Sequence, residues 1–289
     1  MPLHGWLGLG VILGAEAALL SGVRWVGFWL TPIVWTGYVL FADALVFRLI
    51  GRSYLTTDRA EGLGVALCSI GAWWLFEWYN APRFWRGGDD LLGLWWHYWG
   101  LEPNLLLRRV GYDWSFATIF PALFLTAAAL RASVLARVRV RPWTPPPALL
   151  DASIAAGALA VVLPLIVVAS WTVVLVWTGW ALLLEPLNYR AGRESWLRDL
   201  GEGDASRLAS LLASGLVCGL LWEFWNYWAL TKWTYTVPFL PDVKLFEMPV
   251  LGYAGFLPFA LECRAMWVWV LGVLYFRPLP GNSHEEVTR

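Results

Sequence analysis

The chain has 289 residues, of which 59% are hydrophobic and only 15% are charged, and its formal net charge at pH 7 is zero. Soluble globular domains carry about 25% charged residues, so this composition predicts an integral membrane protein. The zero net charge argues against nucleic acid as a partner, because binding to phosphates requires an excess of basic residues.

Eight apolar segments are long enough to cross a hydrocarbon core about 30 Å thick, which takes roughly 20 helical residues. The first begins in "MPLHGWLGLG", which lacks the basic region and cleavage site of a signal peptide, so we expect a retained helix. Turn-forming stretches such as "RGGDD" and "LGEGD" separate later segments. The predicted spans are 6–23, 25–48, 62–80, 112–133, 148–168, 170–190, 207–229 and 252–275.

The connection between the third and fourth spans, 80–111, is too long for a tight turn. It contains the aromatic stretch "LLGLWWHYWGL". We expect this stretch to form a short amphipathic helix in the membrane interface, where it would cover a pocket below it.

Two copies of one pattern lie on either side of a basic, proline-rich linker at 137–147. "WTGYVLFADALVFRLIGRSYL" starts at Trp35 and "WTGWALLLEPLNYRAGRESWL" at Trp177, and both are followed by Glu-x-x-Asn, Trp-x-Tyr and Gly-Tyr elements. The order of these motifs predicts a tandem duplication, with four helices in 1–136 and four in 148–289. The fold expected is therefore all-α, with two four-helix repeats.

Each predicted repeat has an even number of spans, and this number determines the direction in which the second repeat enters the membrane. Both copies enter in the same direction, so their pseudo-twofold axis should lie along the membrane normal. Most Lys and Arg residues fall on the side of the N-terminus, which predicts that both termini are cytoplasmic. We expect a bacterial or archaeal cytoplasmic membrane, with a homo-oligomer or a larger membrane complex as options.

The intramembrane carboxyls divide into two sets by depth. Glu77 and Glu223 come one turn before the outer ends of the third and seventh spans, each with an asparagine one turn later, Asn80 and Asn226. Two carboxyls that share a poorly solvated site cannot both ionise, so one is expected to hold a proton. Because an acid in a span is a functional candidate, we predict that Glu77 and Glu223 are catalytic and that the asparagines orient them.

Asp43 and Glu185 occupy matching places near the inner ends of the second and sixth spans. Arg48 and Arg190 each follow five residues later, so an arginine of the inner interface is the expected partner. This pairing would contribute to folding and not to chemistry.

Tryptophan is concentrated on the outer side, more than an interfacial aromatic belt requires. Aromatic faces stabilise cations, so these rings and nearby acids predict a substrate-binding pocket. The residues expected to line it are Trp74, Trp78, Trp222, Trp225, Tyr253, Glu247 and Glu262.

Two sequence stretches resemble membrane enzymes that act on isoprenoids. "KWTYTVPFLPDVKLFEMPVLGYAGFLPFALE" is similar to the Trp-x-Tyr, Pro-x-Glu-Glu, Phe-Phe pattern of the integral-membrane lycopene cyclase domain, although Glu247 stands alone before its proline. "WEF" after a glycine-rich helix resembles the small membrane terpene cyclases of fungi. The resemblance implies metal-independent protonation of an isoprenoid, with Glu77 and Glu223 as the acids.

Other chemistries lack the residues they need. The three cysteines and three histidines form no metal or disulfide motif, and no aspartate-rich diphosphate-binding motif, phosphate loop or nucleophile triad is present. We therefore expect no metal or cofactor. The predicted function is Glu-initiated cyclisation, hydration or isomerisation of a lipid polyene or carotenoid-like isoprenoid. The alternatives are a lipid- or pigment-binding subunit and a transporter coupled to protons or carrying a cationic solute.

Overall fold

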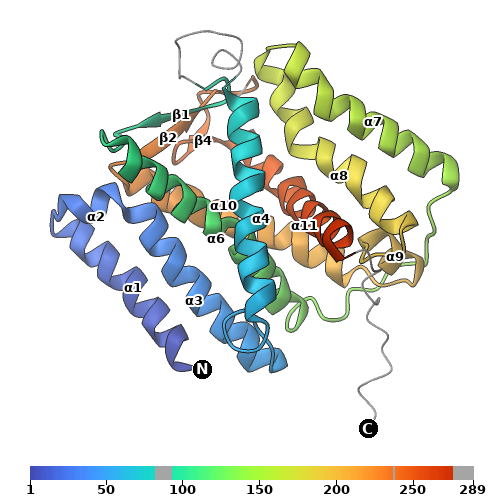
Figure 1. The fold of residues 1–289 in the computed structure, drawn as a ribbon, viewed down its shortest axis with the longest axis horizontal. Helices are drawn as coiled ribbons and strands as arrows, with labels where there is room; N and C mark the ends of the chain where they lie inside the picture. The colour runs from blue at the N-terminus through green and yellow to red at the C-terminus, as the bar shows by residue number, and fades with distance from the viewer. Residues whose placement is uncertain (82–92, 237, 276–289) are drawn as a thin grey trace.

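The computed structural model describes residues 1–81, 93–236 and 238–275. Long helices make up most of this part of the chain (Figure 1). Glycine at the left-handed C-cap of α3, Gly51, allows the sharp exit that follows it. The helices are α1 (Leu3–Leu20), α2 (Arg24–Phe28), α3 (Leu30–Ile50), α4 (Arg59–Asn80), α6 (Leu105–Arg131), α7 (Pro147–Ile166), α8 (Val173–Arg190), α9 (Trp196–Gly201), α10 (Ser206–Trp228) and α11 (Tyr253–Tyr275).

Seven of these helices, within the described residues, are long and apolar enough to cross a membrane: α1, α3, α6, α7, α8, α10 and α11. They establish an integral membrane protein of the all-α class. The remaining predicted span, 62–80, falls in α4, which has 22 residues but does not belong to this set.

In the described part of the chain, four short strands and two 3-10 turns lie outside the long helices. β1 (Trp96–Trp99) pairs with β2 (Lys232–Tyr235), and β3 (Lys244–Leu245) pairs with β4 (Met248–Pro249). The 3-10 turns, Ser170–Thr172 and Val250–Gly252, lead into α8 and α11. The prediction that the stretch "LLGLWWHYWGL" forms an amphipathic helix is wrong for the part that the structure describes. Trp96–Trp99 is a strand, because a partner strand from the second half forms hydrogen bonds with its main chain. Leu91 and Leu92 of that stretch lie outside the described residues.

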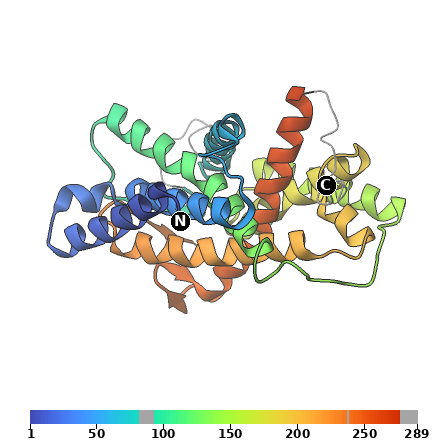
Figure 2. The same ribbon diagram turned by 90° about the horizontal axis from the view of Figure 1, so that it is seen from below.

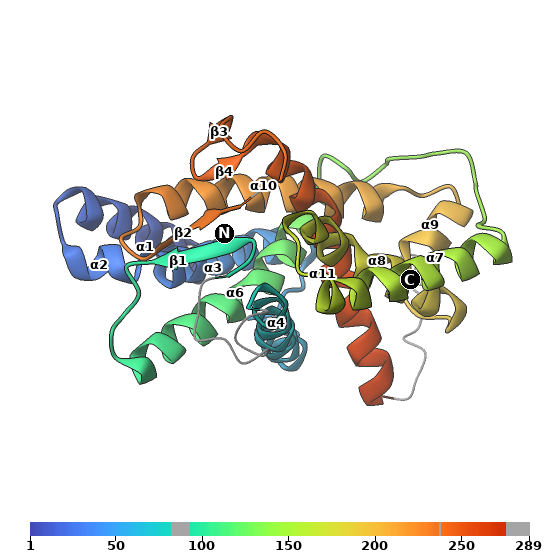
Figure 3. The ribbon, with the colours of Figure 1, turned by 90° about the horizontal axis from the view of Figure 1, so that it is seen from above.

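Two helical hairpins, α1 with α3 and α7 with α8, lie at opposite ends of the molecule (Figures 1 and 3). The other four long helices lie between them, and Figure 2 shows α11 rising steeply from α10. The contacts of the first half recur in the second. α3 packs on α6 as α8 packs on α11, and α4 packs on α6 as α10 packs on α11.

The acids in the C-terminal halves of α3 and α8 hold the turns that follow these helices. Asp43 accepts hydrogen bonds from Ser53 Oγ (2.8 Å) and the main-chain N–H of Leu55 (3.0 Å). Glu185 accepts the equivalent pair from Ser195 Oγ (2.5 Å) and the Leu197 N–H (3.1 Å). The expected arginine partners are wrong, because main-chain and serine donors of each turn occupy the carboxyls. His4 Nε2 is a further partner of Asp43, at 3.1 Å.

The α1–α3 hairpin depends on close main-chain approach at Gly8. A Cβ atom there would overlap the main-chain O of Gly37 and N of Phe41, whereas a Cβ on Gly14 of the same helix meets open space. Small residues allow such approach between membrane helices. We expect Gly8→Val to lower the stability of the purified protein by about 3 kcal/mol, the upper end of overpacking costs.

Gly14→Val is the matched control, and thermal unfolding in detergent measures both variants. An equal effect of the two substitutions would show that helix propensity, and not contact with α3, determines the loss.

Candidate functional site

A two-stranded ribbon, β1 with β2, joins the two halves of the chain at the end of the molecule away from the N-terminus (Figure 1). Trp96 pairs with Tyr235, His97 with Thr234 and Tyr98 with Trp233. Since Trp96 and Tyr98 of one Trp-x-Tyr element correspond to Trp233 and Tyr235 of the other, each tryptophan lies opposite the other copy's tyrosine. This is the pairing that a twofold axis through the ribbon would generate.

Two asparagines attach the ribbon to the helices below it. Asn226 is fully buried; its Nδ2 donates to the main-chain O of Trp233 (2.8 Å), and its Oδ1 accepts the Trp233 N–H (2.9 Å). Asn80 binds the main chain of Trp96 in the same way, at 2.9 and 3.2 Å, and also accepts the Trp95 N–H. The predicted asparagines therefore position the ribbon through its main chain.

Glu77 is held behind the ribbon by three side-chain donors. Its Oε1 accepts from Trp73 Nε1 (2.9 Å), Trp96 Nε1 (3.1 Å) and Tyr98 Oη (2.5 Å). Hydrogen bonds of this kind are stronger to a carboxylate than to a neutral carboxyl. No hydrogen bond joins this carboxyl to Glu223 among the described residues.

Glu223 has the equivalent tyrosine but fewer donors. It is fully buried, and Tyr235 Oη donates to its Oε1 at 2.6 Å. Its Oε2 is also buried and has no partner among the described residues. A buried oxygen without a donor costs less in a neutral carboxyl than in a carboxylate. The two Glu–Tyr pairs thus have the same topology but different capacities to hold a charge.

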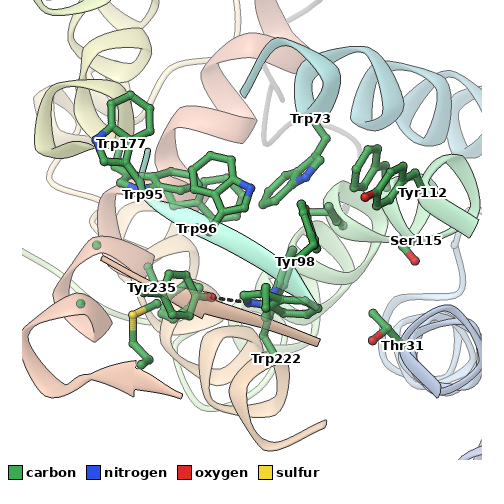
Figure 4. A pocket seen from close by; sticks show the side chains of 18 of the residues that line it. Thr31, Trp73, Trp95, Trp96, Tyr98, Tyr112, Ser115, Trp177, Trp222 and Tyr235 are labelled. Carbon is green, nitrogen blue, oxygen red and sulfur yellow. Dashed lines mark hydrogen bonds between the residues drawn. The ribbon is translucent and has the colours of Figure 1, made fainter. Parts of the chain in front are cut away.

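Both tyrosines line a cavity of about 360 Å³ between the ribbon and the helices. This volume lies within the range of ligand sites, roughly 300–1,000 Å³. Figure 4 shows the rings of Trp73, Trp96 and Trp222 around it. The tryptophans that line it in the described residues are Trp29, Trp35, Trp73, Trp95, Trp96, Trp177, Trp222 and Trp233.

The two halves line this cavity at corresponding positions. From α3 and α8 these include 31, 32 and 35, and 173, 174 and 177. On α6 the lining positions include 108, 111, 112, 115, 116, 118 and 119. Their counterparts, each 140 residues later, are 248 in β4, 251 and 252 in the 3-10 turn, and 255, 256, 258 and 259 in α11. With this offset Tyr112 corresponds to Gly252. The sequence motifs Gly111–Tyr112 and Gly252–Tyr253 would instead pair Tyr112 with Tyr253, so the two alignments differ by one residue.

Of the residues predicted to line a pocket, Trp222 lines this cavity. Three other predicted tryptophans have different surroundings. Trp225 Nε1 donates to Glu16 Oε1 (2.9 Å), which ties α10 to α1. Trp74 Nε1 donates to Asp113 Oδ1 (2.6 Å), and Trp78 is 43% exposed.

The predicted polar lining residues also lie outside the cavity wall. Tyr253 Oη donates to the main-chain O of Leu245 (3.0 Å), and Glu247 pairs with Lys232 (2.9 Å). Glu262 is fully buried and accepts the Trp180 N–H (3.0 Å). Sequence reasoning missed Tyr98, Tyr235 and Trp177 as site residues. Their signal was present, since all three belong to motifs that occur in both halves.

A separate ion-pair cluster joins the turn before α9, α9 itself, the first turn of α10 and the middle of α11. Arg264 binds Glu194 through two bonds of 2.7 Å, and Arg207 pairs with both Glu194 and Asp199 at 2.5 Å. Burial would raise the pKa of Glu194, but the guanidinium groups of Arg264 and Arg207 hold it well below its usual range. This cluster accounts for the arginine in the middle of α11.

Comparison of the chain with models of known protein families, with curated proteins and with solved structures finds no match.

Proposed function

We propose that the protein is a duplicated membrane protein of eight spanning helices, two four-helix repeats related by a pseudo-twofold axis along the membrane normal. The equivalent helix contacts, the ribbon pairing and the matched cavity positions support this arrangement. α4 would be the eighth span as the counterpart of α10. Its Glu77 and Asn80 match Glu223 and Asn226 in both spacing and ribbon contacts. The N-terminus and the α3–α4 turn lie away from β1 and β2 in Figure 1, and positive residues favour this end as cytoplasmic.

The function proposed is acid–base chemistry on an isoprenoid or other polyene in the tryptophan-lined cavity, namely cyclisation, hydration or isomerisation. One observation carries this proposal. Glu223, which is fully buried, and Glu77, which is partly buried, contact the cavity through tyrosines that line it. Isoprenoid reactions that begin with protonation pass through carbocations, and the faces of Trp73, Trp96 and Trp222 would stabilise that charge.

Glu223 is the proposed acid and Tyr235 its relay. In this step the phenol O–H, which donates to Glu223 Oε1 in the structure, turns toward the ligand, and its proton is transferred to a carbon of the ligand's double bond while the neutral carboxyl donates its own proton to the phenol oxygen. The phenol gives one proton and receives another, so it is unchanged. The ligand becomes a carbocation, and Glu223 becomes a carboxylate.

Glu77 is the proposed base, acting through Tyr98. Its three donors stabilise the carboxylate that must take the proton back. Tyr98 passes its proton to Glu77 and accepts one from a carbon beside the cationic centre, which forms the new double bond. This assignment follows a general pattern of acid–base catalysis, in which two carboxyls in different environments take the roles of acid and base.

A direct test is to ask what the cavity holds. We expect an isoprenoid to co-purify with the protein and to be identified by mass spectrometry of a solvent extract. Trp177→Ala should weaken its retention at least about tenfold, because truncating a central aromatic residue in a binding site is costly. Trp171→Ala is the control, since Trp171 is 45% exposed and does not line the cavity. Equal retention by both variants would contradict binding at this site.

A second candidate is a binding protein for a lipid or pigment without chemistry. The observation in its favour is that neither carboxyl itself lines the cavity. A binding protein would retain the same molecule as the enzyme. Its function would not depend on Glu77 or Glu223, and this difference distinguishes the two candidates.

A further inference from the structure

The two halves of the cavity match in position but differ in polarity. Its centre is the same in both halves, with Trp35 and Trp177, and Phe116 and Phe256, at corresponding places. The side chains that line the cavity on either side of these central rings differ in polarity between the two halves. A ligand that spans the cavity therefore meets two ends of different chemistry.

The half formed by α3 and α6 carries polar groups. Thr31 lies on α3, and Arg108, Tyr112, Ser115 and Thr118 follow one face of α6. Figure 4 shows Thr31, Tyr112 and Ser115 on the same side of the pocket, away from Trp95 and Trp177. Polar groups on one helix face give this end a run of hydrogen-bonding positions.

The corresponding positions in the other half carry none of these groups. Val173 replaces Thr31, Met248 replaces Arg108, and Gly252, Gly255 and Pro258 replace the tyrosine, serine and threonine. The substitutions all run in one direction, from polar to apolar. This half suits a hydrocarbon chain.

One hydroxyl in the polar half has no partner. Thr31 Oγ1 is buried and makes no hydrogen bond within the described residues. The hydroxyls of Ser115 and Thr118, by contrast, donate to the main-chain O of Gly111 (2.8 Å) and of Ser115 (2.6 Å). Leaving a buried hydroxyl unpaired costs free energy, so such a group at a cavity wall points to a partner in the ligand.

We infer that the ligand is an isoprenoid with one oxygenated end, a hydroxyl or carbonyl group. That group binds beside Thr31, Tyr112 and Ser115, and the hydrocarbon chain extends toward Val173 and Gly255. The inference rests on the proposed function for the identity of the cavity as the ligand site. The inference adds the orientation of the ligand in the cavity, which the tryptophans alone would not determine because they occur in both halves.

The test compares two probes on the purified full-length protein, a diterpenoid polyprenyl alcohol and the hydrocarbon of equal chain length, titrated by native mass spectrometry. The wild type should bind the alcohol about tenfold more tightly, the effect of one or two neutral hydrogen bonds. The double variant Thr31→Val, Tyr112→Phe keeps both side-chain sizes and should lose this preference. Val173→Thr, at the matching position of the apolar half, should keep it.

The outcomes are distinct. Equal binding of alcohol and hydrocarbon by the wild type would overturn the oxygenated end but leave the cavity as an isoprenoid site. A preference that survives in the double variant would place the polar contact elsewhere and also overturn the inference. Binding of neither probe by a folded wild type would contradict the proposed function itself.

Discussion

Glu223→Gln should lower turnover of a polyene substrate by about 10²- to 10⁴-fold, the usual contribution of a positioned acid or base. Glutamine keeps the size of the side chain and can still contact Tyr235, but it has no proton to transfer. The measurement is conversion of an acyclic polyene in membranes that contain the protein, followed by liquid chromatography with absorption and mass detection. Glu77→Gln should cause a loss of similar size, because the carbocation then lacks its base.

The tyrosines provide a second measurement of the same step. Tyr235→Phe removes the relay but keeps Glu223 and the ring, so it should reduce turnover while ligand retention changes little. Tyr253→Phe is the control, since the Tyr253 hydroxyl binds the main-chain O of Leu245 and the residue does not line the cavity. Full activity in the Glu77→Gln, Glu223→Gln double variant would refute acid–base catalysis and favour the binding protein.

Glu194→Gln should destabilise the fold by about 3 kcal/mol. The substitution removes the charge that faces both Arg264 and Arg207, and breaking a buried ion pair costs about 3–5 kcal/mol. The lower end applies because the side chains of Arg264 and Glu194 are 20% and 22% exposed. Thermal unfolding in detergent measures the loss.

Asp58→Asn is the control for this variant. Asp58 pairs with Arg52, whose side chain is 71% exposed, and exposed pairs contribute up to about 1 kcal/mol. If the two variants lost equal stability, the ion-pair cluster around Glu194 would not be a main element of the fold.

The same carboxyl predicts how stability depends on pH. The pKa of Glu194 is lower in the folded protein than its ordinary value of 4.5. A lowered pKa means that the unfolded chain binds the proton more readily, so the stabilisation is present above pH 4.5 and is lost as the pH falls below it. Glu194→Gln should remove this part of the acid sensitivity.

The sequence by itself determined the membrane-crossing helices, and it predicted the correspondence between the halves. Apolar length and turn residues are properties of one segment, so seven predicted spans coincide with helices of membrane-crossing composition. The Trp-x-Tyr and Glu-x-x-Asn elements could be matched because spacing within a helix or strand is local. For the same reason Glu77 and Glu223 could be selected, since an acid among tryptophans is visible without a fold.

Only the tertiary structure decided what those acids touch. Asp43 and Glu185 bind the turns after their own helices instead of arginines, and Glu77 accepts a hydrogen bond from Tyr98. The strand at Trp96–Trp99 exists because Lys232–Tyr235, far away in the chain, supplies its partner. Each of these outcomes depends on which donors the folded chain brings near, from the following turn or from a distant strand, and the free energy of pairing a buried polar group outweighs local helix preference.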